Sequence, residues 1–463
     1  AIPPAVDSCF GFEGTLVSRR IAVCALVPDV GHLTPLFVLA RHLRALGKDV
    51  RAFVPDEAQH TAERFGVMFE TLGKALVPNH AGLFDRAASV SRWAFQVYWW
   101  GWLVERYTVP VTAQGTRLTE GLLSRLRRYA PDILITDEHL FVPEYRWLAG
   151  QLGIPLVLNH SAGTNSREQR RKFWLDVNVE RANRFGDRIR ALEYAFDKRF
   201  RREKWRRLRE ERRQIEQSRA ARATGPAPPR VERLSMGLAA IEIEELGDRI
   251  SSVEGVNRFQ AHTPQLVGTI EPALADWLGV AEPRSVLYVA SGSIVSMPAR
   301  AVRTMIREAL RAGLRVLVAD GSGRFSWTGD SRVLVQRWVP QTAVLAHPAI
   351  AAFVTHAGAT SIQEALWNGV PVLCHPLMSD QHYNAWVAEQ LGFGLCLDVS
   401  GMPRERFGLR LRRILDTPSY RETARRIGAA FRAQPGEVGA CRLIDRMLEG
   451  GPSAADVART AVE

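Results

Sequence analysis

Residues 355–366, THAGATSIQEAL, have the pattern of a buried strand, a glycine turn at Gly358 and the start of a helix. The first N–H groups of a helix lack backbone partners and the helix dipole is positive there, so such a turn stabilises a bound pyrophosphate. His356, Thr360 and Ser361 add side-chain donors. His356 alone would more often be a packed structural histidine, but beside this turn a phosphate contact is favoured.

Two further residues near this turn suit a nucleoside. Trp338 follows an apolar run and precedes Pro340, where a flat apolar ring can stack on a nucleobase. Glu364 lies on the helix after the turn, where its carboxylate can accept hydrogen bonds from ribose hydroxyls. The alternatives are an ordinary core tryptophan and a surface glutamate.

Residues 337–385 resemble the signature segment of the UDP-sugar-dependent glycosyltransferases of the GT-B fold, the family that glycosylates small molecules. The similarity rests on a WxPQ start, a THxG turn, an SxxEAL helix opening, GVP and DQxxNA, in register without gaps. Weaker similarity covers most of the chain outside residues 166–230. Residues 357–360 depart from the family, because they read Ala-Gly-Ala-Thr where plant-type members have Cys-Gly-Trp-Asn.

The resemblance implies a set of contacts with the sugar donor. Trp338 would hold uracil together with the Val339 backbone and Gln341, and Asp380 and Gln381 would hydrogen-bond the sugar hydroxyls. A carboxylate beside an amide also suits the vicinal diols of a hexose, and Gln381 favours glucose.

A second loop of this half offers hydroxyl donors. Ser291 and Ser293 follow the apolar run of residues 283–290, near the expected phosphates or sugar. The segment carries no DxD-like carboxylate pair, so we expect no metal and no cofactor, with the UDP-sugar as co-substrate.

The N-terminal half should supply a base. His32 follows Gly31 at the turn between the first strand and its helix, where a neutral imidazole can take a proton from an acceptor hydroxyl. It matches the catalytic histidine of the family. Asp137, at the end of the run PDILITD, is in the right place to orient this imidazole, and Asp132, which precedes the run, is the second choice.

Residues 92–107 concentrate aromatic side chains, and three of them, Phe95, Trp99 and Trp102, are candidates to line an acceptor pocket. A helix packed into the core, or an interfacial patch for membranes, explains the concentration equally well.

Apolar runs alternate with helical patterns in both halves of the chain, which predicts an α/β protein with two doubly wound, Rossmann-like domains and a cleft between them. We expect an N-terminal acceptor-binding domain over residues 1–255 and a C-terminal nucleotide-sugar-binding domain over residues 256–463. The last helix is expected to pack back on the N-terminal domain.

The net charge of +12 is concentrated in one segment. Residues 167–222 hold 20 Lys/Arg and 10 Asp/Glu, whereas the rest of the chain is nearly neutral, which argues against nucleic-acid binding. Apolar residues at helical spacing predict that residues 166–230 are an amphipathic, basic helical insert. Its charges form a solvated face or, as the alternative, contact a membrane surface.

Other classes are disfavoured by simple features. No apolar stretch is long enough to span a membrane, and the five cysteines show no CxxC spacing, so we expect a cytoplasmic protein without a disulfide framework.

The sequence thus favours inverting transfer of a sugar, with glucose from UDP-glucose as the expected donor, to a hydroxyl of a small phenolic or terpenoid acceptor. The alternative is a non-catalytic nucleotide-sugar-binding or membrane- and partner-recruiting protein of the same fold.

Overall fold

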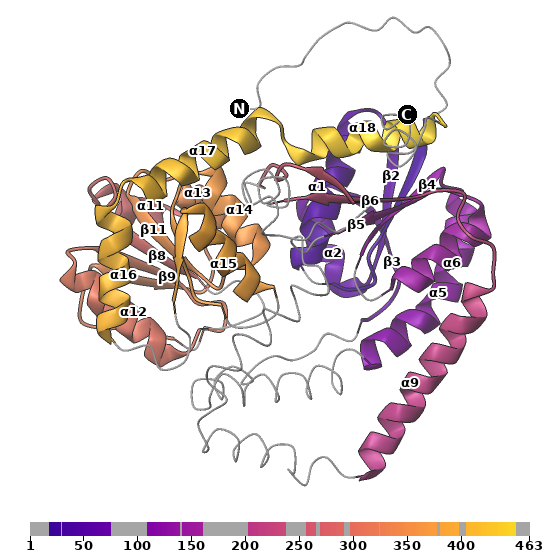
Figure 1. Ribbon diagram of the computed structural model, residues 1–463, viewed down its shortest axis with the longest axis horizontal. Coiled ribbons are helices and arrows are strands. Elements are labelled where there is room, and N and C mark those ends of the chain that lie inside the picture. The colour runs from indigo at the N-terminus through magenta and orange to yellow at the C-terminus, as the bar shows by residue number, and fades with distance from the viewer. Residues whose placement is uncertain are drawn as a thin grey trace, which may run out of the picture.

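Two parallel β-sheets, each covered by helices on both faces, organise the chain in the computed structural model (Figure 1). The structure describes residues 18–28, 30–75, 109–138, 141–160, 202–237, 256–264, 269–290, 297–323, 325–376, 380–397 and 404–450. The expected architecture of two doubly wound α/β domains is confirmed.

The N-terminal sheet has the strand order β3-β2-β1-β4-β5-β6-β7. Its central strands are buried on both faces because helices cover both, so they read as continuous apolar runs in the sequence. The strands are β1 (Arg20–Cys24), β2 (Asp49–Val54), β3 (Met68–Thr71), β4 (Ile133–Asp137), β5 (Leu156–Asn159), β6 (Val231–Met236) and β7 (Val256–Phe259). The helices are α1 (Val30–Ala45), the short 3-10 turn η1 (Asp56–Ala58), α2 (Gln59–Arg64), α5 (Val109–Tyr129), α6 (Val142–Leu152) and α9 (Arg202–Ala223).

The C-terminal sheet has the order β10-β9-β8-β11-β12-β13. Its strands are β8 (Val286–Ala290), β9 (Arg315–Ala319), β10 (Val333–Gln336), β11 (Ile350–Thr355), β12 (Val372–Cys374) and β13 (Gly394–Cys396). Its helices are α11 (Pro272–Gly279), α12 (Ala299–Arg311), α13 (Gln341–Leu345), α14 (Ala359–Trp367), α15 (Gln381–Leu391), α16 (Arg404–Asp416) and α17 (Ser419–Ala433).

The last described helix, α18 (Gly436–Leu448), crosses from the C-terminal to the N-terminal domain (Figure 1). Its apolar side, including Leu443 and Ile444, is buried in one hydrophobic cluster with α1 and the N-terminal sheet. Lys48 adds an ion pair to Asp445 at 2.8 Å. Two chain segments therefore join the domains.

The predicted boundary after residue 255 needs a correction. β7 pairs in parallel with β6, with Val256 opposite Arg233, so it belongs to the N-terminal sheet. A strand of four residues carries no local signal of which sheet it will join, because that choice depends on its partner strand.

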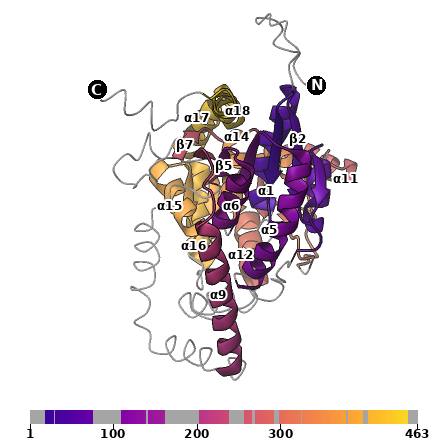
Figure 2. The ribbon, with the colours of Figure 1, turned by 90° about the vertical axis from the view of Figure 1, so that its right-hand side faces the viewer.

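The interpretation of residues 166–230 as one insert is wrong for residues 202–230. α9 precedes β6, which pairs in parallel with β5, and parallel neighbours need a long crossover connection. α9 packs on α5 and α6 (Figure 2). Its Arg219 Nε lies 2.8 Å from the fully buried carboxylate of Glu144. Residues 166–201 lie outside the described part of the chain.

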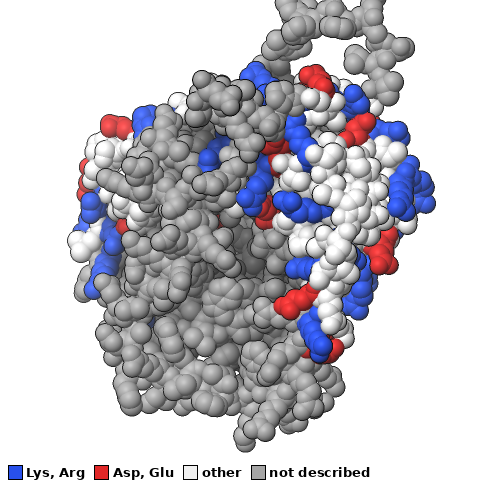
Figure 3. Space-filling model, turned by 45° about the vertical axis from the view of Figure 1, so that its right-hand side comes forward, with Lys and Arg blue, Asp and Glu red and all other residues white. Residues whose placement is uncertain are grey.

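The charges of the described residues do not form one basic surface on the face shown in Figure 3. There, Lys and Arg side chains are interspersed with Asp and Glu. The expectation of a membrane contact through residues 167–222 stays a prediction. Within the described residues, no helix is long and apolar enough to span a bilayer, and the four cysteines found there are free thiols.

Candidate active site

His32 and Asp137 meet at the carboxyl edge of the N-terminal sheet. His32 lies in the first turn of α1, just after β1, and Asp137 ends the neighbouring strand β4. The Nδ1 atom of His32 is 2.9 Å from Oδ2 of Asp137. The side chain of His32 is 24% exposed, whereas that of Asp137 is only 6% exposed, so the imidazole can reach a ligand while the carboxylate stays behind it.

Asp132, the second candidate, lies at the opposite end of β4. Its Oδ2 accepts a hydrogen bond of 2.7 Å from the Arg20 backbone N–H, and its Oδ1 is 3.3 Å from the Arg19 guanidinium. Asp132 therefore joins two strand ends and is separated from His32 by the length of the strand.

The turn between β11 and α14 has the geometry of an anion site. The His356 ring lies directly over Gly358, since a Cβ atom added there would be 2.4 Å from Nε2, and this explains why glycine is needed. Burial lowers the pKa of His356 to about 4, so at neutral pH the imidazole is neutral. It can still offer an N–H, beside the open N–H groups of α14 and the hydroxyls of Thr360 and Ser361 in its first turn.

Gln341 links the positions expected for the uracil and the ribose. Its Nε2 donates to Glu364 and, at 3.3 Å, to Ser361, while its Oε1 accepts a hydrogen bond of 3.2 Å from Tyr288. Burial raises the pKa of Glu364 to about 7, although the bond from Gln341 opposes this shift. The sequence analysis missed Tyr288, a buried strand residue, because no local pattern indicates that its hydroxyl donates a hydrogen bond to Gln341.

Trp338 lies after β10 with 57% of its surface exposed, whereas Val339 beside it is buried. An exposed indole is uncommon and leaves a ring surface open for stacking. The Arg64 guanidinium, from α2 of the other domain, lies 5.8 Å from the ring centre.

The DQ segment is tied to the glycine turn. Asp380 precedes α15, and Asn384 Nδ2 donates to its Oδ2 at 3.0 Å and to the Ala357 carbonyl at 2.9 Å. Gln381 is largely buried, at 6% exposed. Asn384 is the asparagine of the DQxxNA spacing, so the motif itself could have revealed this structural link.

The two carboxyl edges face each other. Besides Arg64 and Trp338, Gly237 after β6 lies against Gln363 of α14, where an added Cβ would be 2.8 Å from the amide nitrogen. His32, the candidate general base, and the candidate donor-binding residues thus lie on opposite sides of one domain junction.

Five predicted contact residues lie outside the described part of the chain: Phe95, Trp99, Trp102, Ser291 and Ser293. Their roles stay predictions. The described residues include no group of three or more potential metal ligands.

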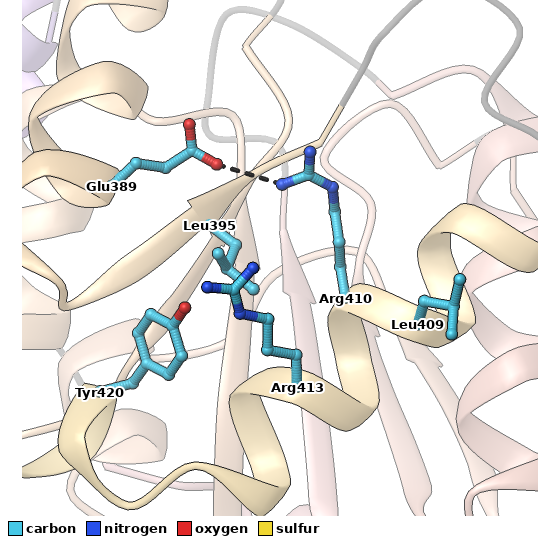
Figure 4. Close-up of a pocket in the computed structure, with 6 residues that line it drawn as sticks. All are labelled: Glu389, Leu395, Leu409, Arg410, Arg413 and Tyr420. Carbon is cyan, nitrogen blue, oxygen red and sulfur yellow. Dashed lines mark hydrogen bonds and ion pairs between the residues drawn. The ribbon is translucent and has the colours of Figure 1, made fainter.

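A cavity of about 430 Å³ lies elsewhere, between α15, β13, α16 and α17 (Figure 4). Its lining includes Arg413, Tyr420 and the ion pair of Arg410 with Glu389 at 3.1 Å. None of the predicted site residues lines it.

Comparison with known sequences finds similarity in the C-terminal part of the chain. Residues 276–438 match the family model for UDP-glucoronosyl and UDP-glucosyl transferase. Nuatigenin 3-beta-glucosyltransferase from Solanum aculeatissimum is 35% identical over 133 residues, which cover 27% of this chain and 27% of that protein. UDP-glucuronosyltransferase 2A3 from Mus musculus is 34% identical over 114 residues, 25% of this chain and 21% of that protein. The matches thus span about a quarter of these relatives.

Solved structures extend the similarity to nearly the whole chain. The glycosyltransferase SnogD from Streptomyces nogalater superposes with a TM-score of 0.63 over 93% of this chain and 99% of its own, at 21% identity. At this identity the comparison bears on the fold, and it confirms the expected GT-B architecture.

Proposed function

From the premise that residues 276–438 belong to the UDP-glycosyltransferase family and that the chain has the GT-B fold, we propose that this protein transfers a sugar from a UDP-sugar to a hydroxyl of a small molecule. The observation that carries the proposal is the His32–Asp137 pair, which faces the donor segment across the domain junction. A protein that only bound the nucleotide would not need this pair.

The chemistry follows from the positions of these groups. Asp137 holds the Nδ1 side of the His32 ring, so Nε2 is the atom that accepts the proton of the acceptor hydroxyl. The acceptor oxygen attacks the anomeric carbon as the bond to the β-phosphate oxygen breaks, and UDP leaves with both electrons of that bond. A single displacement of this kind inverts the anomeric configuration.

The leaving diphosphate meets the α14 N-terminus, where open N–H groups and the helix dipole stabilise negative charge. His356, Thr360 and Ser361 add hydrogen-bond donors. Trp338 stacks on uracil, and Glu364 accepts hydrogen bonds from the ribose.

Glucose is our proposed donor sugar, because Asp380 and Gln381 offer an acceptor and a donor at neighbouring positions. The similar proteins include both a glucosyltransferase and a glucuronosyltransferase by name, so the donor must be decided by assay. We propose a phenolic or terpenoid acceptor on the basis of the aromatic segment 92–107.

The proposal is tested by measuring UDP release with UDP-glucose, UDP-glucuronic acid and dTDP-glucose, each with a panel of phenolic and terpenoid alcohols. We expect acceptor-dependent release that is fastest with UDP-glucose and a glycoside product of inverted configuration. Nucleotide binding without acceptor-dependent release from any of the three donors would contradict the proposal.

A further inference from the structure

Asn159 is the residue next to Asp137 in the sheet. It ends β5, and the register of the parallel strands places it directly opposite Asp137, which ends β4. Neighbouring strands lie about 4.8 Å apart, so the two side chains start within reach of each other.

Both side chains point to the face that α1 covers. Side chains alternate along a strand, and Ile135 and Val157, two residues before Asp137 and Asn159, are buried in the cluster formed with α1. His32, on α1, contacts Asp137 from this face. Asn159 is therefore on the same side of the sheet as the proposed catalytic pair.

The Asn159 side chain is fully buried, and within the described part of the chain neither its amide nitrogen nor its amide oxygen has a hydrogen-bond partner. Asp137 is in a similar position, because neither carboxylate oxygen makes a hydrogen bond within the described residues, although Oδ2 lies 2.9 Å from Nδ1 of His32. Buried polar groups in folded proteins are rarely left unpaired, so two such groups side by side call for an explanation.

We propose that Asn159 is a positioning residue for the His32–Asp137 pair. Its Nδ2–H donates a hydrogen bond to Oδ1 of Asp137 in the working enzyme, which sets the plane of the carboxylate and leaves Oδ2 for Nδ1–H of His32. The role rests on the proposed function, since it matters to turnover only if His32 is the base. Asn159 does not touch substrate, because it has no exposed surface.

Two substitutions of similar size separate positioning from packing. Asn159→Leu removes the donor, and we expect kcat to fall about tenfold or more at every pH, with the KM for the UDP-sugar within twofold. Asn159→Asp can replace the donor only while its carboxyl is protonated. Its kcat relative to the wild type should therefore be highest at low pH and fall as the pH rises, which a packing role would not produce.

Thr136→Val is the matched control. The Thr136 hydroxyl is as buried as Asn159 and equally lacks a hydrogen-bond partner, but alternation places it on the opposite face, with Leu134 and α6. We expect its kcat and pH profile to stay within twofold of the wild type.

A readout without turnover keeps this inference separate from the proposed function. The imidazole pKa of His32, followed by NMR titration, should rise by about one unit in Asn159→Asp, because a second carboxylate then faces the imidazolium. Circular dichroism and UDP affinity verify that each variant folds. If folded Asn159→Leu keeps its kcat while His32→Ala loses it, the positioning role is wrong and the proposed function stands. If His32→Ala keeps full turnover, the proposed function fails, and the NMR titration alone decides whether Asn159 acts on the pair.

Discussion

The carboxyl edges of the two sheets differ in how their polar residues are assembled. On the C-terminal edge, the candidate residues from Trp338 to Gln381 are close together in the sequence, and local turns and helix starts position them. On the N-terminal edge, His32 and Asp137 come from distant segments that meet only because β1 pairs with β4. The candidate donor-binding residues can therefore be recognised as a motif, whereas the candidate base and its partner depend on strand order.

The two edges also differ in electrostatics. The N-terminal edge pairs an imidazole with a carboxylate, which prepares a base for accepting a proton. On the C-terminal edge, burial lowers the pKa of His356 to about 4 and raises that of Glu364 to about 7, so both groups tend toward their neutral forms. A neutral imidazole beside a helix N-terminus can donate a hydrogen bond to an anionic diphosphate.

The largest expected effect is at the N-terminal edge. His32→Ala should lower kcat by about 10²–10⁴-fold while UDP affinity, measured by calorimetry, stays within twofold, because general-base catalysis acts on the acceptor proton. His160→Ala is the control, since His160 pairs with Glu138 at 3.2 Å at the same sheet edge. Equal losses in both variants would mean that the edge needs histidines only for its structure.

Trp338→Ala should weaken UDP binding rather than slow the chemical step. Base stacking contributes about 1–3 kcal/mol, so the Kd for UDP should rise roughly 5- to 150-fold while kcat at saturating donor changes much less. Trp277→Phe is the control in the same domain. The Arg315 guanidinium carbon lies 4.3 Å from the centre of the Trp277 ring. An unchanged Kd in Trp338→Ala would contradict the proposed stacking of Trp338 on the nucleobase.

A smaller effect on turnover is expected from residues 166–201. Replacing them with a Gly/Ser linker while keeping α9 should change the acceptor KM or acceptor range several-fold, with UDP affinity within twofold, because the donor residues lie on the other domain. Loss of salt-sensitive binding to anionic vesicles would instead support the membrane alternative for the basic segment. A loss of UDP affinity in the folded variant would place the segment at the donor site.

The smallest effect concerns Glu364. Because the pKa of Glu364 is raised to about 7, its ionised form, the better acceptor for ribose hydroxyls, increases between pH 6 and 8. UDP affinity should therefore rise several-fold over this range and should rise less in Glu364→Gln. The comparison with the variant is essential, since the UDP phosphate itself titrates near pH 6. Parallel pH curves for both proteins would rule out a titrating Glu364.

Local patterns were sufficient for several conclusions. Apolar runs such as those of β4 and β8 identified buried parallel strands, because a strand covered on both faces must be apolar throughout. The glycine turn before α14 and the DQxxNA spacing were also visible, since helix starts and turns are set by residues close in sequence. These features carried the resemblance to the UDP-glycosyltransferases, whose family model matches residues 276–438.

Features that depend on contacts between distant segments could not be decided in this way. The contact of His32 with Asp137 needed β1 to lie beside β4, and the assignment of β7 needed its pairing with β6. The role of α9 as a crossover helix was hidden because its arginines dominate the composition, while Arg219 is in fact paired with the buried Glu144.

Chain segments near one another in sequence interact whatever the rest of the molecule does, and so the proposed nucleotide-binding elements of this protein can be predicted from its residue order. Three features arise only when distant segments pack: the strand order, the crossing of α18 onto α1 and the alignment of Asn159 with Asp137. Hydrophobic burial favours any partner that covers an apolar face, so only the complete fold determines which segment becomes that partner.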